Sequence, residues 1–174
     1  MAVNFTKLSV LVVEDNKPMR DLIVSILDGL GVRTIYTSDN GASGFQSFRN
    51  YNPDIVIADW EMPNRNGLDL TREIRRNSLS PNRMVPLIML TGYSAPKRVA
   101  MARDTGVTEF LAKPFTAEGL INRISYVINK PRDFIDHLEY FGPDRRRKKI
   151  EDYKGPCRRK SDKVTVGWGN ETKG

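Results

Sequence analysis

The sequence has little cysteine and no long apolar run. Its 174 residues include a single cysteine, Cys157, which cannot form a disulfide within the chain, so a reducing cytoplasm is the simplest location. No apolar run approaches the ~20 residues that span a bilayer, so we expect no transmembrane segment. Residues 1–7 also lack the apolar core of a secretory signal peptide. These absences argue against a secreted, disulfide-stabilised or membrane-spanning protein.

Acidic residues are outnumbered in one segment of the chain. The formal net charge is +7, and residues 143–163 contain ten Lys or Arg against four Asp or Glu, so the rest of the chain is close to neutral. We expect one core-bearing domain at residues 1–130 and a basic, arginine-rich extension at residues 131–174, which we predict to be largely irregular and flexible. A basic surplus confined to one segment indicates a local anionic partner.

Strand-like and helix-like patterns alternate five times before residue 130. Runs rich in apolar and β-branched residues, typical of strands, occupy residues 8–13, 32–37, 55–58, 85–90 and 107–112. Helix-like patterns follow at residues 16–31, 40–50, 68–76, 94–105 and after 116, with Asn16, Ser94 and Thr116 as N-caps. Short connections between the repeats predict an α/β fold, in which helices cover both faces of a doubly wound, five-stranded parallel sheet.

Chemically active side chains fall where successive predicted strands end. Glu14 and Asp15 follow the first strand, Asp59 ends the third, Thr91 the fourth and Lys113 the fifth. The carboxyl ends of parallel strands share one edge of the sheet, where ligands bind in open α/β folds. Taken singly, an acidic pair most often caps a helix, and Thr-Gly or Lys-Pro most often forms a turn. The conjunction of all five residues is what points to a common site.

Three carboxylates at one edge repel one another and need a cation. Mg²⁺ binds oxygen ligands and keeps waters that leave room for a phosphoryl group, and Lys113 would add a fixed positive charge. Thr91 would add a hydroxyl donor and Asp59 a carboxylate nucleophile. This set of groups predicts Mg²⁺-dependent phosphoryl transfer onto Asp59.

Four segments of the sequence resemble those of a known family. Leu-Val-Val-Glu-Asp-Asn, Ile-Val-Ile-Ala-Asp-Trp-Glu-Met-Pro-Asn-Arg-Asn-Gly, Met-Leu-Thr-Gly and Phe-Leu-Ala-Lys-Pro-Phe are similar to signatures of response-regulator receiver domains, the CheY-like fold. The resemblance covers about residues 7–129. It implies a flavodoxin-like strand order of 2-1-3-4-5. It also implies that Asp59 accepts a phosphoryl group from a histidine kinase or a phosphotransfer protein of a two-component system.

The resemblance implies a magnesium site as well. Mg²⁺ would bind Asp15, Asp59 and the backbone carbonyl of Glu61, with Glu14 contacting it through water. Glu14 stands where the family more often has Asp, a change that the family tolerates. Glu61 and Tyr93 would flank the path of the water that attacks the phosphoryl group, and so would tune the lifetime of the phosphorylated state.

A conformational switch is the third implication of the resemblance. Thr91 and Lys113 would contact the phosphoryl oxygens, Phe110 would turn inward on activation, and the bond before Pro114 would be cis. Phe110 lacks the hydroxyl of the Tyr that is usual in the family, so the switch would work by packing alone. The face formed by the fourth helix, fifth strand and fifth helix would then change shape for a downstream protein.

A phosphatase with an aspartate nucleophile is the alternative enzyme class. Such enzymes place Asp-any-Asp after the first strand, and Glu14-Asp15-Asn16 does not match that pattern. We therefore expect that the protein is not an enzyme but a phosphoacceptor, which catalyses only its own phosphorylation and dephosphorylation. No helix-turn-helix pattern follows residue 130, so a nucleic-acid-binding regulator would depend on the extension alone.

The extension contains a short internal sequence repeat, whose two copies are offset by thirteen residues. Residues 139–146 and 152–159 both read acidic, aromatic, any, Gly, Pro, any, Arg, Arg. We predict that each Gly-Pro forms a turn that aims the following arginine pair, and that aromatic residues such as Tyr140 and Phe141 offer stacking faces. Guanidinium groups form forked hydrogen bonds with phosphates and with the O6/N7 edge of guanine.

This extension resembles the arginine-rich extension of a subset of CheY-like proteins in flagellated bacteria. In that subset the extension binds cyclic di-GMP, and the protein acts at the flagellar motor or in surface attachment. The residues that would bind the ligand here are Arg145, Arg146, Arg147, Arg158 and Arg159. Three alternatives stay open: a disordered tail that contacts only a protein partner, nucleic acid bound with a steep salt dependence, and an anionic membrane surface.

Overall fold

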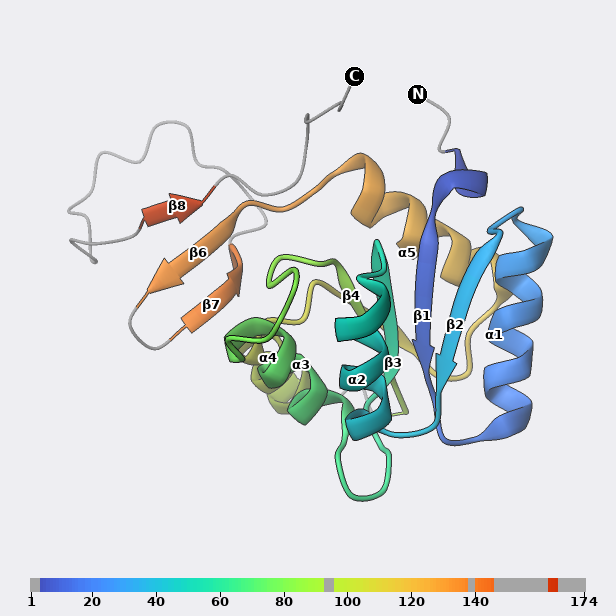
Figure 1. Cartoon of the computed structure of the whole chain (residues 1–174), viewed down its shortest axis with the longest axis horizontal. Coiled ribbons are helices and arrows are strands. Elements are labelled where there is room, and N and C mark those ends of the chain that lie inside the picture. Colours follow the sequence, from blue (N-terminus) through green and yellow to red (C-terminus); the bar gives the residue numbers. More distant parts are fainter. Residues whose placement is uncertain (1–3, 93–95, 138–139, 146–162, 166–174) are drawn as a thin grey trace.

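The computed structural model describes residues 4–92, 96–137 and 140–145 and the backbone of residues 163–165. Its elements are η1 (Phe5–Lys7), β1 (Ser9–Val13), α1 (Lys17–Gly29), β2 (Thr34–Ser38), α2 (Gly41–Tyr51), β3 (Ile55–Asp59), α3 (Gly67–Arg76), β4 (Leu87–Thr91), α4 (Pro96–Thr105), β5 (Glu109–Ala112), α5 (Ala117–Asn129), β6 (Phe134–His137), β7 (Tyr140–Pro143) and β8 (Lys163–Thr165). In Figure 1, helices cover both sides of the sheet formed by the first five strands, and β6 and β7 lie beside α3 and α4. Within these ranges no helix combines the length and apolar character that a bilayer crossing needs.

The central sheet has the predicted strand order and direction. Its order is β2-β1-β3-β4-β5, and all four neighbouring pairs are parallel. Every residue of β3 and β4 is buried, as expected for central strands that are covered on both faces. The predicted doubly wound, five-stranded fold is therefore confirmed.

Successive side chains along each strand point to opposite faces of the sheet and so form two separate apolar layers. On one face, Val10, Val12, Ile57 and Leu90 pack with Ile23 and Leu27 of α1 and with Leu120, Ile124 and Val127 of α5. On the other face, Leu11, Val13, Ala58 and Met89 pack with Phe45 and Phe48 of α2, with Leu70 and Ile74 of α3 and with Ala102 of α4. The two layers fix the sheet, so the carboxyl ends of its strands meet at one rigid edge.

Two predicted helix N-caps are confirmed by their hydrogen bonds. The Asn16 side chain accepts a hydrogen bond from the backbone N–H of Met19 at 3.0 Å, and the Thr116 hydroxyl accepts one from Gly119 at 3.0 Å. Each cap satisfies an N–H group that the first turn of a helix leaves without a partner. The predicted cap at Ser94 lies outside the described residues.

The described part of the extension contains three strands, whereas we predicted a largely irregular extension. β6 pairs antiparallel with β7 on one side and with β8 on the other, and we call these three strands the extension sheet. The turn predicted at Gly142 and Pro143 is wrong, because both residues belong to β7 and are buried. Proline is compatible with that position because β7 is an edge strand. A Cβ atom on Gly142 would lie 2.9 Å from the Cα atom of Gly106, so glycine is required for close packing here.

A buried arginine at the end of α3 joins the extension sheet to the central domain. The side chain of Arg75 is fully buried. It donates hydrogen bonds to the carbonyl of Gly106 at 3.0 Å, the carbonyl of Arg83 at 2.8 Å and the hydroxyl of Thr108 at 3.4 Å, and its guanidinium carbon lies 5.1 Å from the ring centroid of Phe134. Burial lowers the pKa of Arg75 to about 9, so the group stays charged at neutral pH.

Further contacts hold the aromatic residues of the extension sheet. The guanidinium carbon of Arg83 lies 3.9 Å from the ring centroid of Phe141, and the hydroxyl of Tyr140 donates to the carbonyl of Pro143 at 2.7 Å. Arg132 donates to the backbone carbonyls of Thr108 and Asp144. These contacts lie where α3 and α4 end, which is the edge of the central sheet opposite the carboxyl ends of its strands.

Candidate functional site

Asp59 is a buried carboxylate at the carboxyl end of β3. The residue is 6% exposed, and one carboxylate oxygen lies 3.0 Å from Nζ of Lys113, which follows β5. The same Nζ lies 2.9 Å from Oε2 of Glu14, which follows β1. Lys113 precedes a cis bond to Pro114, as predicted. Three residues far apart in the sequence therefore meet at one edge of the sheet.

The site also offers a set of oxygen ligands that suits a hard divalent cation. Carboxylate oxygens of Glu14, Asp15 and Asp59 all lie within 4.8 Å of one another. Glu14 and Asp59 are buried, whereas Asp15 is exposed. Magnesium prefers oxygen donors and keeps part of its water shell, so two buried carboxylates beside one exposed carboxylate match its chemistry. Among the described residues, this cluster fits the predicted Mg²⁺.

Burial dominates the titration of the buried carboxylates. It raises the pKa of Glu14 and of Asp59, while the hydrogen bond that each receives from Lys113 lowers the pKa and only partly offsets the effect. Burial by itself would lower the pKa of Lys113, but its hydrogen bonds to Glu14 and Asp59 and the negative charges of these two residues together outweigh burial, and the pKa is raised. Lys113 is thus held as a cation, and additional positive charge at the site would favour the ionised carboxylates.

Thr91 and Phe110 lie on the strands next to the acidic cluster. Thr91 is the last residue of β4 and is buried. Its backbone carbonyl accepts a hydrogen bond from the N–H of Lys113 at 2.8 Å, which ties the ends of β4 and β5 together. Phe110 lies in β5 opposite Met89 and is half-buried against the apolar layer of α2 and α3. Thr91 is therefore at the strand end next to Asp59, whereas Phe110 lies two positions before the end of β5 and is half-buried in the apolar layer.

The loop after Asp59 folds back onto the end of β3. The N–H of Gly67 donates to the carbonyl of Trp60 at 3.0 Å, and a Cβ atom on Gly67 would lie 2.3 Å from the carbonyl oxygen of Asp59. Glycine at this position lets the loop close tightly. Burial raises the pKa of Asp59, and a hydrogen bond from the backbone N–H of Glu61 to the Asp59 carboxylate acts in the opposite direction. Glu61 thus lies directly beside Asp59.

Two arginines contact the site without having been predicted. Arg98 of α4 forms an ion pair with Glu61 at 3.0 Å, and its guanidinium carbon lies 4.6 Å from the ring centroid of Trp60. Arg20 of α1 donates to the backbone carbonyl of Glu14 at 2.6 Å. In sequence both arginines look like ordinary surface residues of amphipathic helices, so no local signal distinguishes them. Tyr93, which we expected near the site, lies outside the described residues.

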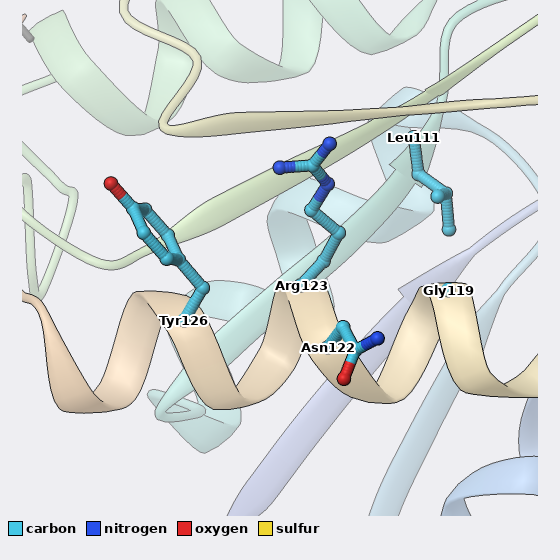
Figure 2. A pocket seen from close by; sticks show the side chains of 5 residues that line it. All are labelled: Leu111, Gly119, Asn122, Arg123 and Tyr126. Carbon is cyan, nitrogen blue, oxygen red and sulfur yellow. The ribbon is translucent and has the colours of Figure 1, made fainter.

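A hollow of ≈ 380 Å³ lies on the surface between β5 and α5. Leu111, Gly119, Asn122, Arg123 and Tyr126 line it, and Figure 2 shows the side chains of Arg123 and Tyr126 extending from α5 on the same side of the helix. The residues of the acidic cluster do not line this hollow. It belongs instead to the face that we predicted to change shape for a downstream protein.

Of the five arginines that we predicted to bind a ligand in the extension, one, Arg145, is among the described residues. Arg145 forms an ion pair with Asp104 of α4 at 2.9 Å, and its guanidinium carbon lies 4.1 Å from the ring centroid of Tyr140. The other four predicted ligand-binding arginines (Arg146, Arg147, Arg158 and Arg159) lie outside the described residues. Asp104 is near the end of α4, so Arg145 is at the opposite edge of the central sheet from Asp59.

The sequence of the central domain matches a known family. Residues 10–125 match the family described as the response regulator receiver domain. The match covers most of the central domain and ends before the extension sheet begins. Together with the strand order, it shows that the chain belongs to the response regulator receiver family and has a CheY-like receiver domain of two-component signalling.

Individual relatives agree with this assignment. The chain is 31% identical to the chemotaxis protein CheY1 of Helicobacter pylori over 122 residues, which are 70% of this chain and 97% of that protein. It is 34% identical over 116 residues to the CAI-1 autoinducer sensor kinase/phosphatase CqsS of Vibrio cholerae, a match that covers 67% of this chain but 17% of the kinase. The solved structure of the Vibrio cholerae chemotaxis protein CheY4 is similar with a TM-score of 0.64 and 26% identity, over 69% of this chain and 98% of that one.

Proposed function

We propose that this chain is a response regulator in which Asp59 accepts a phosphoryl group from the phosphohistidine of a kinase or a phosphotransfer protein. The observation that carries the proposal is the buried Asp59 carboxylate held 3.0 Å from the Lys113 ammonium, beside Glu14 and Asp15. A buried nucleophile with a fixed cation and a set of carboxylate ligands suits phosphoryl transfer, because that reaction depends mainly on positioning and on charge stabilisation.

The reaction forms one bond and breaks one bond. An oxygen of Asp59 attacks phosphorus while the bond between phosphorus and the imidazole nitrogen breaks, and the nitrogen keeps the electron pair and takes a proton from solvent. Lys113 moves its hydrogen bonds toward the phosphoryl oxygens, and the hydroxyl of Thr91 donates to one of them. Asp15, Asp59 and the backbone carbonyl of Glu61 would hold Mg²⁺, with Glu14 contacting it through water, and the bound ion would supply neutralisation of charge on the phosphoryl oxygens.

Labelling with a small phosphoryl donor tests this proposal. The purified chain is incubated with acetyl phosphate and Mg²⁺ and analysed on a phosphate-affinity gel. Asp59→Asn should abolish the shifted band, because the amide is a poor nucleophile. Asp54→Asn is a matched control, since Asp54 lies at the opposite end of β3 and accepts hydrogen bonds from Ser9. Undiminished labelling of Asp59→Asn, or turnover of a phosphomonoester substrate, would reject the phosphoacceptor assignment.

The output of the phosphorylated domain would be a changed protein-binding face. We propose that Thr91 moves toward the new phosphoryl group and that the half-buried ring of Phe110 fills the space it leaves. The surface of α4, β5 and α5, including the hollow beside Tyr126, would then recruit a downstream protein. Phe110→Ala should retain labelling at Asp59 but lose the phosphorylation-dependent change in the amide signals of α5.

The extension would provide a second input. We propose that its arginines bind an anionic ligand, for which cyclic di-GMP is the leading candidate, and that the protein regulates motility or attachment, for instance at the flagellar motor. The ten Lys or Arg of residues 143–163 support a binding role, and Arg145, already stacked on the ring of Tyr140, would exchange the carboxylate of Asp104 for a phosphate of the ligand.

A competition titration separates the ligands. Saturable binding of cyclic di-GMP at physiological salt, unaffected by excess GTP or duplex DNA, would support the dinucleotide. Equal competition by any polyanion would reject it and favour a nucleic-acid or membrane surface. Absence of binding to all of them would leave the extension as a contact for a protein partner.

A further inference from the structure

Arg98 contacts both residues that follow Asp59 in the sequence. Its Nη1 atom lies 3.0 Å from Oε1 of Glu61, and its guanidinium lies over the ring of Trp60 with a separation of 4.6 Å from the centroid. Trp60 is buried, so the guanidinium rests on a fixed platform. α4 is therefore attached, through one side chain, to the loop that begins at Asp59.

The negative charge of the Glu61 carboxylate is unfavourable for a site that must bind an anionic phosphoryl donor. Its backbone N–H donates to the Asp59 carboxylate, so the Glu61 side chain starts directly beside the reacting oxygen. The site already contains the carboxylates of Glu14, Asp15 and Asp59. A Glu61 carboxylate released from Arg98 would be free to turn toward this cluster, where a fourth negative charge would repel a phosphoryl donor.

We propose that Arg98 is a positioning residue that holds the Glu61 carboxylate against α4 and neutralises it, so that small anionic phosphoryl donors can reach Asp59. This inference rests on the proposed role of Asp59. The exposures of the two side chains, 30% for Arg98 and 54% for Glu61, place the pair at the boundary between the site and solvent. A charge at that boundary acts on the approach of a donor more than on the stability of the fold.

The expected effect follows from the freed carboxylate. In Arg98→Ala the Glu61 side chain keeps its negative charge and loses its partner, so the rate of labelling by acetyl phosphate should fall roughly three- to tenfold. The loss should be smaller for phosphoramidate, which carries less negative charge. It should also shrink as salt rises, because the screening length falls from about 30 Å at 0.01 M to about 3 Å at 1 M ionic strength.

The experiment is a double-mutant cycle in the full chain at saturating Mg²⁺. The rate of labelling is followed on phosphate-affinity gels for the wild type, Arg98→Ala, Glu61→Gln and the double variant. Glu61→Gln in the Arg98→Ala background should restore most of the lost rate, and Arg98→Lys should stay within about twofold of the wild type because it keeps the charge. Arg72→Ala is the matched control, since Arg72 pairs with Asp69 at 2.8 Å on the surface of α3.

Three results would overturn the proposal. The first is that Arg98→Ala is labelled as fast as Arg72→Ala. The second is that Arg98→Ala slows labelling by the same factor in the wild-type and the Glu61→Gln backgrounds, and the third is that its effect does not depend on salt or on donor charge; either result would make Arg98 a purely structural contact. A failure of the Asp59 assignment itself looks different, because labelling would then survive Asp59→Asn whatever the residue at position 98.

Discussion

Replacing Phe134 by Ala tests whether the extension sheet is part of the folded domain. Phe134 is 4% exposed, its ring lies 5.7 Å from that of Phe141, and the buried Arg75 guanidinium lies over its face. Removing a buried Phe side chain costs about 3–5 kcal/mol in a core. We expect the lower value, about 3 kcal/mol, because β6 can partly detach and avoid the cavity. For a chain of this size that loss lowers Tm by about 6–12 °C.

Urea unfolding and calorimetry measure the effect, with Leu79→Ala as the control. Leu79 is 58% exposed, so its truncation should change the free energy of unfolding by less than about 0.5 kcal/mol. A Phe134→Ala variant as stable as the Leu79→Ala control would refute the reasoning. The extension sheet would then unfold independently of the central domain, and the burial of Arg75 beneath it would not persist in solution.

Three further changes probe the site and the extension sheet. Gly67→Ala would place a Cβ atom 2.3 Å from the Asp59 carbonyl, so it should lower both Tm and the rate of labelling; wild-type values for either would contradict the close approach. Burial raises the pKa of Tyr140. The protonated Tyr140 hydroxyl therefore contributes to stability below the ordinary tyrosine pKa of about 10, and this contribution is lost as the pH rises through the raised pKa. Tyr140→Phe should therefore flatten the decline of urea midpoints above about pH 10, and parallel declines in both proteins would refute this. Lys113→Met removes the cation between Glu14 and Asp59, so labelling should fall about tenfold or more and Mg²⁺ should raise Tm by more than in the wild type; an unchanged Mg²⁺ effect would contradict the charge balance.

The central fold was predictable because strand and helix periods differ and repeat. Five apolar runs alternate with amphipathic segments, and only a parallel sheet with short crossovers satisfies that order. The meeting of Asp59, Lys113 and Glu14 followed from topology alone, since parallel strands end at one edge. The helix N-caps at Asn16 and Thr116 were equally predictable, because an N-cap side chain forms its hydrogen bond within the first turn of the helix that it begins.

Contacts between distant charged or aromatic residues were not predictable. Arg75 looks like a surface residue of an amphipathic helix, yet it is fully buried because Gly106, Thr108 and Phe134 surround it. Nothing within α3 signals these partners. Arg98 was missed for the same reason, since its partners belong to the loop after Asp59.

The extension was misread in its local detail. Gly-Pro is a strong turn signal, but at Gly142 it serves close packing against Gly106 within a strand. Tyr140 and Phe141 were assigned to a ligand as stacking faces, whereas in the structure they are buried against the central domain. A short segment with three aromatic residues can bury them on its neighbour as readily as it can offer them to a ligand, and sequence alone does not decide between the two.

Mapping the phosphorylated residue tests the central claim most directly. The chain labelled with acetyl phosphate is reduced with borohydride, which converts an aspartyl phosphate to homoserine, and its peptides are sequenced by mass spectrometry. We predict homoserine at Asp59 within residues 52–67. Homoserine at Asp15 or Asp54 instead, or a phosphate that resists borohydride and therefore lies on a hydroxyl, would contradict the account.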